Sequence, residues 1–148
     1  MKLDYHEEMK LKNQFCFPIY AASRQVTQLY TPLLKPLGLT YTQYLVFLVL
    51  WEEDGITVGE ICNRLMLDNG TISPVLKKIE TLGYIERRRS KNDDRVVIIY
   101  LTEKGKDLQE KAKDIPEKML NCVNLPKDKA IELRSLLYEL LDSTRNNK

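Results

Sequence analysis

The stretch from residue 67 to residue 101 constrains the fold of this chain more than any other. Its first half has apolar residues at the spacing of one helix face, a pattern that Gly83 ends. These apolar positions are Ile72, Val75, Leu76, Ile79 and Leu82. Two strand-like runs follow at 84–88 and 95–101, with residues 92–94 (Asn-Asp-Asp) at the turn between them. A short helix followed by a hairpin is the order of parts in a winged helix-turn-helix, whose helix fits the DNA major groove.

A further helix is expected directly before this segment, which completes the helix-turn-helix. Thr57 and Glu60 have the spacing of a capping box, in which the two side chains satisfy free amides at a helix start. The apolar residues that follow are spaced as in a helix. Because proline is tolerated only near the start of a helix, Pro74 predicts that the second helix begins close to Gly70 or Thr71.

The rest of the chain also predicts helices. The amino-terminal pattern is Phe15, Ile19, Ala22, Val26 and Leu29, and we expect Pro32 and Pro36 to close that helix. Thr40 opens an apolar segment through Trp51 that should form the central core. A polar helix is expected from residue 102 to about residue 120. The last helix, after residue 126, carries the apolar residues Ile131, Leu133, Leu136, Leu137, Leu140 and Leu141.

A chain of 148 residues, 43% of them apolar, is long enough for one compact domain and too short for two independent ones. The apolar faces of the end helices are difficult to bury within one such domain, so we expect a second copy of the chain to cover them. The predicted fold is mostly α with a small β wing. One domain spans residues 1–148, with a DNA-binding winged helix-turn-helix lobe at 40–101 and dimerisation helices at 1–35 and 105–148. The alternative is that the end helices fold onto their own domain.

Local charge, rather than net charge, favours DNA as a partner. The whole chain carries only +2, but residues 67–101 hold seven basic and five acidic side chains, and four of the seven basic ones fall between 87 and 91. We expect Ser73 and Lys77 to meet base edges and Arg95 to enter the minor groove. The other predicted DNA-binding residues are Asn69, Thr71, Lys78, Arg87, Arg88 and Arg89. The alternative is that these charges form a solvated face.

Other classes of protein are disfavoured. The amino terminus lacks the apolar core of a secretory signal, and no run approaches the ~18 apolar residues that a membrane helix needs. Three widely spaced cysteines and a single histidine, His6, predict neither a zinc site nor a disulfide framework. We expect a cytoplasmic protein with no membrane partner, no metal and no cofactor.

Several segments resemble the MarR family of winged-helix regulators. They are residues 41–44 (YTQY), 67–80 (LDNGTISPVLKKIE), 93–95 (DDR) and 101–105 (LTEKG). Residues 15–17 (FCF) and 20–24 (YAASR), with Tyr30 and Tyr41, are more closely similar to the branch that senses organic hydroperoxides. The resemblance runs from about Asn13 to the last helix. It departs at Asn69, where that branch usually has serine.

The resemblance implies a homodimeric repressor, not an enzyme, that binds a pseudo-palindromic double-stranded DNA operator. Its amino-terminal cysteine, here Cys16, is then oxidised by an organic hydroperoxide, after which the protein releases DNA. Tyr30 and Tyr41 match tyrosines that hydrogen-bond the sensing sulfur from the partner subunit. Some members of the branch pair this sulfur with a low-molecular-weight thiol, whereas others have a resolving cysteine near the carboxyl-terminal helices, where Cys122 stands. We expect Cys122 to resolve Cys16 of the other subunit; the alternative is a cysteine at a helix end that never meets Cys16.

The residues around Cys16 agree with this chemistry. A thiol attacks peroxide as the thiolate, so a sensing cysteine must be accessible and near groups that favour an anion. Pro18 predicts a helix that begins a few residues earlier, which places Cys16 in the first turn beside free amides. Phe15 and Phe17 suit an apolar peroxide. The alternative is a cysteine that is simply buried in the core, as we expect for Cys62.

Two other functions use the same residues differently. A MarR-type regulator can respond to a small aromatic ligand, with Cys16 only lining the pocket; a Cys16→Ser protein would then still release DNA. A thiol peroxidase would also use Cys16, but the sequence offers no histidine base and only Arg24 near it. We therefore expect a redox-controlled repressor.

Overall fold

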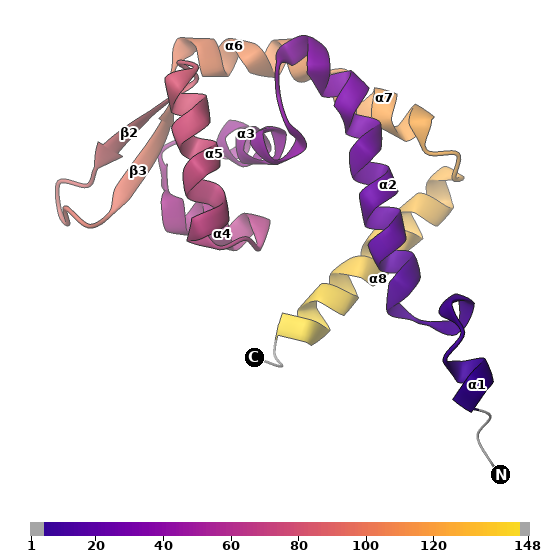
Figure 1. Ribbon diagram of the computed structural model, residues 1–148. Coiled ribbons are helices and arrows are strands. Elements are labelled where there is room, and N and C mark those ends of the chain that lie inside the picture. The colour runs from indigo at the N-terminus through magenta and orange to yellow at the C-terminus, as the bar shows by residue number, and fades with distance from the viewer. Residues whose placement is uncertain (1–4, 146–148) are drawn as a thin grey trace.

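The computed structural model describes residues 5–145, and Figure 1 shows how its elements follow one another. The first half contains α1 (Tyr5–Glu8), η1 (Leu11–Asn13), α2 (Cys16–Leu34), η2 (Lys35–Leu37), α3 (Tyr41–Glu52), β1 (Ile56–Thr57) and α4 (Val58–Leu65). The second half contains α5 (Asn69–Thr81), β2 (Ile85–Arg89), β3 (Val97–Leu101), α6 (Glu103–Ala112), α7 (Ile115–Cys122) and α8 (Lys127–Arg145). The predicted mostly helical fold with a small β wing is confirmed.

The wing is part of a three-stranded antiparallel sheet in the order β1-β3-β2, so the prediction of a two-stranded hairpin was incomplete. In register, Ile99 of β3 lies between Ile56 of β1 and Arg87 of β2. The first strand has only two residues, which is too short to show an alternating pattern in the sequence. Figure 1 shows β2 and β3 projecting at one end of the molecule, beside α5.

The helix starts follow the capping signals. Thr40 and Thr57 both form capping boxes, with Gln43 and Glu60 respectively, as the sequence predicts for Thr57. Helix α5 begins at Asn69, slightly before the predicted start at residue 70 or 71. The reason is Asp68, whose carboxylate accepts a hydrogen bond from the Thr71 amide at 2.7 Å and so caps the helix.

The core lies where α3, α4, α5 and the sheet meet. Its fully buried side chains include Phe47, Leu50, Ile61, Ile72, Leu76, Ile79, Ile85 and Ile99. Helix α6 is fixed to this core through Gly105, whose carbonyl accepts a hydrogen bond from the Trp51 indole at 3.0 Å. A Cβ atom on Gly105 would lie 2.2 Å from the Tyr84 carbonyl oxygen, so only glycine permits this approach.

Two predicted helix boundaries differ from the structure. The polar helix expected from residue 102 to about 120 is broken at Lys113 and Asp114, because Pro116 in the first turn of α7 cannot continue the hydrogen-bonding of α6. The amino-terminal helix ends at Leu34, so Pro32 lies inside its last turn, and Pro36 falls in the η2 turn that follows.

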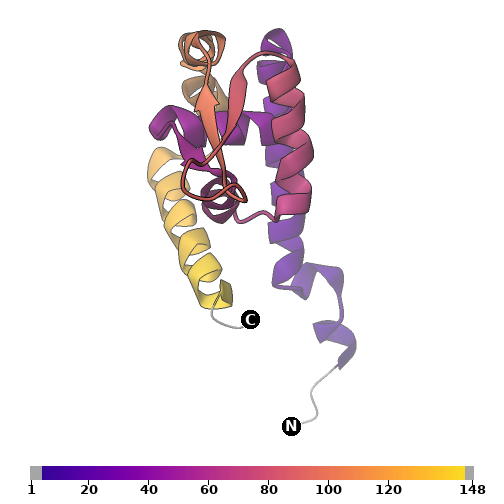
Figure 2. The same cartoon turned by 90° about the vertical axis from the view of Figure 1, so that its left-hand side faces the viewer.

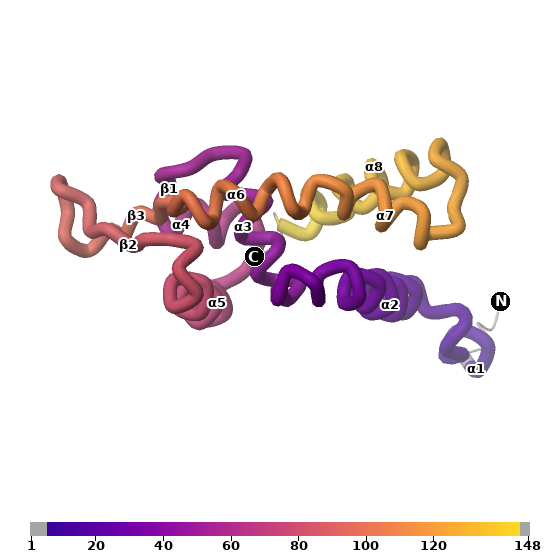
Figure 3. Tube along the Cα trace, turned by 90° about the horizontal axis from the view of Figure 1, so that it is seen from above, coloured from indigo at the N-terminus to yellow at the C-terminus, as the bar shows by residue number. Residues whose placement is uncertain are grey.

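The long end helices leave most of their surface uncovered in the single chain. Among the residues described, α8 has no buried residue and α2 buries only Leu34. The two helices cross in projection in Figure 1 but lie apart in Figures 2 and 3. Helix α2 packs on α3 and α7 instead. The predicted dimerisation spans, 1–35 and 105–148, also include residues 1–4 and 146–148, which lie outside the described part of the chain.

Within residues 5–145, no single helix is long and apolar enough to cross a membrane. By length and composition alone, two consecutive helical segments would be long and apolar enough to cross a membrane if taken together. They are Cys16–Leu37 and Tyr41–Glu52, and the chain bends by 75° between them.

Candidate functional site

Helix α5 has one face in the core and one in solvent. Ile72, Leu76 and Ile79 are buried at the helical spacing that the sequence predicts. The opposite face presents predicted DNA-binding residues: Asn69, Thr71, Lys77 and Lys78 are exposed and Ser73 is half-buried. This face can therefore meet a ligand without unfolding the helix.

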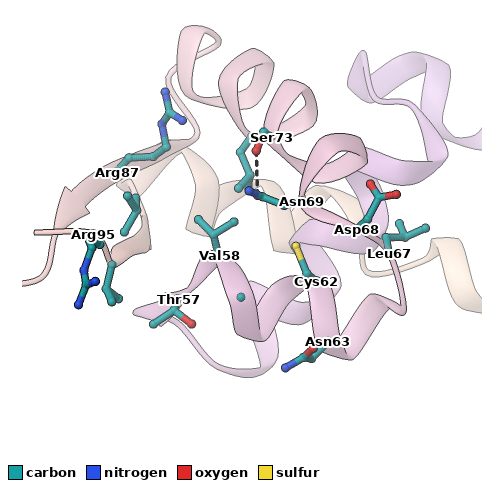
Figure 4. Close-up of a pocket in the computed structure, with 14 residues that line it drawn as sticks. Thr57, Val58, Cys62, Asn63, Leu67, Asp68, Asn69, Ser73, Arg87 and Arg95 are labelled. Atoms are coloured by element: carbon teal, nitrogen blue, oxygen red, sulfur yellow. Dashed lines mark hydrogen bonds between the residues drawn. The ribbon is translucent and has the colours of Figure 1, made fainter. Parts of the chain in front are cut away.

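Two side chains at the start of α5 are joined. The Ser73 hydroxyl donates a hydrogen bond to the Asn69 side-chain oxygen at 2.9 Å, across one helical turn (Figure 4). The Thr71 amide, by contrast, is already bound to the Asp68 carboxylate. Hydrogen bonding with the Thr71 side chain, and next with this amide, lowers the pKa of Asp68 below its ordinary value of 3.8, so the cap carries a negative charge at neutral pH.

An open groove of about 650 Å³ separates this part of α5 from the wing. In Figure 4, Arg87 and Arg95 lie on the wing side of the groove, Asn69 and Ser73 on the α5 side, and Thr57 and Val58 at the start of α4. The full lining is Thr57, Val58, Gly59, Cys62, Asn63, Leu67, Asp68, Asn69, Ser73, Leu76, Arg87, Arg95, Val96 and Val97. The structure therefore brings together four of the predicted DNA-binding residues.

The wing arginines are held by acidic neighbours that the sequence analysis did not single out. Arg87 binds both carboxylate oxygens of Glu80 at 3.2 Å each. Arg88 binds Glu86 at 2.7 Å and stacks over the Tyr100 ring at 4.7 Å.

Arg95, at the tip of the wing, binds Asp93 at 3.2 and 3.3 Å. It keeps the pKa of that carboxyl below the ordinary 3.8. Its side chain is nevertheless 90% exposed, which suits a residue that reaches into a groove. Arg89 and the two lysines of α5 are also exposed.

Cys16 lies apart from this groove, at the first residue of α2, which confirms the prediction that it stands in a first turn. The thiol residue is exposed, as are Phe15 at 73% and Phe17 at 38%. It is therefore not the buried core residue that the sequence left as an alternative. One turn further along α2, Tyr20 stacks under the Arg24 guanidinium at 5.5 Å.

Tyr30 and Tyr41 contact each other but not Cys16 of the same chain. Their ring centroids are 4.6 Å apart, at the junction of α2 and α3. Burial, and next the neighbouring Tyr41 and Tyr44, raise the pKa of Tyr30 to about 12, and burial also raises that of Tyr41. Both hydroxyls are thus protonated at neutral pH and can donate hydrogen bonds. Since Tyr30 is fourteen residues after Cys16 on one helix, the two lie about 21 Å apart along the axis.

The other two cysteines have different surroundings. Cys122 is exposed at the last residue of α7. Cys62 is only partly buried, so the prediction of a core cysteine was incomplete: it packs against the core but also lines the groove. Burial, and then the nearby Asp68 carboxylate, raise the pKa of Cys62. Among residues 5–145, no cluster of three or more His, Cys, Asp or Glu side chains could hold a metal ion.

Comparison with known proteins places this arrangement among regulators. A family model described as the transcriptional regulator SarA/Rot matches residues 28–112, which is more than half of the chain. The chain is also 47% identical over 137 residues to the organic hydroperoxide resistance transcriptional regulator of Bacillus subtilis (strain 168), with 93% of each chain covered. Both matches include the whole helix-turn-helix and wing.

Two solved structures of AbfR from Staphylococcus epidermidis are similar in fold. Reduced AbfR bound to DNA has a TM-score of 0.82 at 36% identity, over 96% of this chain and 97% of that one. AbfR with its disulfide formed has a TM-score of 0.62 at 37% identity, over 96% of this chain and 94% of that one. The arrangement of helices described above is therefore more similar to the reduced, DNA-bound relative than to the disulfide-bonded one.

Proposed function

This chain belongs to the SarA/Rot family of transcriptional regulators, DNA-binding winged-helix proteins of the MarR type, and we propose that it is a dimeric, cytoplasmic repressor controlled by oxidation of Cys16. An organic hydroperoxide is the oxidant, and oxidation releases the operator. The observation that carries this proposal is the position of Cys16: an exposed thiol in the first turn of a long helix, flanked by exposed aromatic rings and remote from the DNA-binding groove.

The DNA-binding half of the proposal rests on the groove between α5 and the wing. Helix α5 enters the major groove with Asn69, Thr71, Ser73, Lys77 and Lys78 on its outer face. Arg87, Arg88 and Arg89 meet phosphates along β2, and the exposed Arg95 reaches the adjacent minor groove. Arg87, Arg88 and Arg95 are each bound to a different carboxylate of the same chain. Each arginine can therefore exchange its carboxylate for a DNA phosphate with little rearrangement.

A second copy of the chain completes the molecule. Helix α8 exposes Ile131, Leu133, Leu136, Leu137, Tyr138 and Leu141, each at 38% or more. So many exposed large apolar side chains on one helix are unusual on a monomeric protein and are covered by a symmetric partner in many two-fold dimers. The two recognition helices would then bind half-sites of a pseudo-palindromic operator about 34 Å apart.

The dimer also supplies what the single chain lacks at Cys16. Tyr30 and Tyr41 cannot touch the sulfur of their own chain, because the length of α2 lies between them. Their protonated hydroxyls can instead donate hydrogen bonds to Cys16 of the partner, which stabilises the thiolate. A half-buried tyrosine pair beside Phe15 and Phe17 gives an apolar site suited to an organic peroxide.

The proposed reaction has two steps. The Cys16 thiolate attacks one oxygen of the peroxide, the O–O bond breaks, and the other oxygen leaves as an alcohol after taking a proton. The resulting sulfenic acid condenses with the thiol of Cys122 from the partner, forming a disulfide and releasing water. A low-molecular-weight thiol can take the place of Cys122 in this second step.

A disulfide between the chains would change the spacing of the two recognition helices. Cys16 is the first residue of α2 and Cys122 the last residue of α7, and these two helices pack on each other within one chain. A covalent link to the partner would therefore displace both helices. Two rigid lobes that no longer match successive half-sites lose the operator without any change in α5 itself. The lower similarity to the disulfide-bonded AbfR agrees with such a rearrangement.

A mobility-shift assay separates redox control from control by a ligand. The DNA is a pool of duplexes enriched by the reduced protein, and the wild type and Cys16→Ser are each given one equivalent of cumene hydroperoxide or an excess of salicylate. We expect peroxide to release DNA from the wild type alone. Release of DNA from Cys16→Ser by salicylate, with no response of the wild type to peroxide, would identify the ligand-controlled regulator instead.

A further inference from the structure

We propose that Asn69 and Ser73 act as one unit in base recognition, and that this unit selects guanine rather than adenine where the start of α5 meets the operator. The inference rests on the proposed DNA-binding function and concerns its sequence specificity. It follows from the hydrogen bond between the two side chains, which fixes the group that Asn69 can present to a base.

The geometry places the pair at the DNA-facing surface. Asn69, Ser73 and Lys77 are spaced by four residues, so they follow one another along the outer face of α5. The first two also line the groove opposite Arg87 and Arg95 (Figure 4). In helix-turn-helix proteins, residues at the start of the second helix contact base edges while basic residues beside it contact phosphates. The pair is therefore placed to meet bases, with the wing arginines on the backbone.

The chemistry of the pair differs from that of a free asparagine. A free side-chain amide reads adenine with both of its ends, because its oxygen accepts from N6 and its nitrogen donates to N7. Here the oxygen already accepts the Ser73 hydroxyl at 2.9 Å. The nitrogen, with two hydrogens, remains to be presented, and an exposed donor of this kind matches the two acceptors of guanine, O6 and N7.

Lys77 extends the same pattern. Its exposed ammonium group lies one turn beyond Ser73 and carries donors only. The outer face of α5 thus offers donors at two successive turns, whereas the amide oxygen of Asn69 has one lone pair engaged by Ser73 and is held toward that side chain. Guanine-containing half-sites are the expected consequence.

The test is selection from a library of random duplexes by the reduced, full-length protein, followed by sequencing. Wild type should enrich guanine at one position of each half-site, and substitution of adenine there should weaken binding by about tenfold. Ser73→Ala frees the amide oxygen and should move the preference at that position from guanine toward adenine. Ser73→Thr keeps the hydroxyl and is the matched control, which should retain guanine. The melting temperatures of the variants verify that each one folds.

Three results would overturn the inference, and they can be told apart. If Asn69→Ala weakens binding equally to every duplex, Asn69 contacts the sugar-phosphate backbone and reads no base. If Ser73→Ala selects the same sequences as the wild type, the hydrogen bond does not determine specificity. If the wild type enriches no sequence at all, the proposed DNA-binding function fails together with the inference.

Discussion

The Arg87 guanidinium donates hydrogen bonds to both carboxylate oxygens of Glu80, at 3.2 Å each, and so connects strand β2 of the wing to helix α5. Both side chains are 36% exposed. The bond joins the two elements proposed to read DNA, near the carboxyl-terminal end of α5, and it holds them in a fixed relation. Two hydrogen bonds between the same pair of side chains restrict their relative orientation more than a single hydrogen bond does.

Removal of this link should have a small effect on stability and a clear effect on DNA binding. Because water screens both groups, a double-mutant cycle with Glu80→Gln and Arg87→Gln should give a coupling free energy of about 0.2–1 kcal/mol in urea unfolding. Arg87→Gln should also reduce the slope of log affinity against log salt by about one. An unchanged salt slope would show that Arg87 remains paired with Glu80 in the complex.

Gly105 should tolerate no side chain. A Cβ atom there would approach the Tyr84 carbonyl to 2.2 Å, so Gly105→Ala should lower the free energy of unfolding by about 1–3 kcal/mol. The matched control is Gly59→Ala in α4, where the nearest atom is 3.8 Å away. That change should stabilise the protein by up to about 1 kcal/mol, since alanine favours helix. Equal unfolding midpoints for the two variants would contradict the packing described for α6.

The tyrosine pair should make the folded protein sensitive to alkaline pH. The pKa of Tyr30 is raised from 10.0 to about 12 by burial and by its neighbours. The unfolded chain therefore loses this proton first as pH rises, and the stability associated with the protonated form, complete below pH 10, is lost between pH 10 and about 12. Tyr30→Phe should show a shallower decline in unfolding free energy over that range. The same decline in both proteins would mean that burial at this position does not control the titration.

Oxidation should link two chains through Cys122. With one equivalent of cumene hydroperoxide and no added thiol, the wild type should run at twice its monomer mass on a non-reducing gel, because the Cys16 sulfenic acid meets the exposed Cys122 of a partner. Cys122→Ser should stay at the monomer mass, and it should form a mixed disulfide when glutathione is added. Cys62→Ser is the control and should dimerise like the wild type. A full yield of linked dimer from Cys122→Ser would assign the resolving role to another residue.

Much of the fold could be predicted because its signals are local. Thr57 with Glu60 and the stop at Gly83 fix the limits of the helix-turn-helix through bonds between near neighbours. The strand Ile56–Thr57 could not be predicted, since two residues show no period and their strand pairing is with β3, about forty residues later. Pro74 predicts the start of α5 only to within a residue or two, because the Asp68 side chain, which caps the helix, sets its first residue.

For the candidate site too, some features could be predicted from the sequence and others could not. The sequence and its family resemblance identified the basic residues of the wing and the position of Cys16 in a first turn. They did not identify Glu80 as the partner of Arg87, because that contact depends on how β2 lies against α5. They also did not reveal that Asn69 and Ser73 are bonded, which requires knowing that both fall on the outer face of one helix. Side-chain pairing across elements is a tertiary property that residue spacing alone does not determine.

The central claim is that oxidation of Cys16 reduces the affinity for DNA. The most direct measurement is the dissociation constant for one enriched duplex, by fluorescence anisotropy at fixed salt, before and after one equivalent of cumene hydroperoxide. We expect the wild type to bind about 5–150-fold more weakly after oxidation, a range typical of coupled sites, and to recover with dithiothreitol, whereas Cys16→Ser keeps one value throughout. An unchanged constant for a wild-type protein whose Cys16 is fully oxidised, as verified by mass spectrometry, would contradict the account.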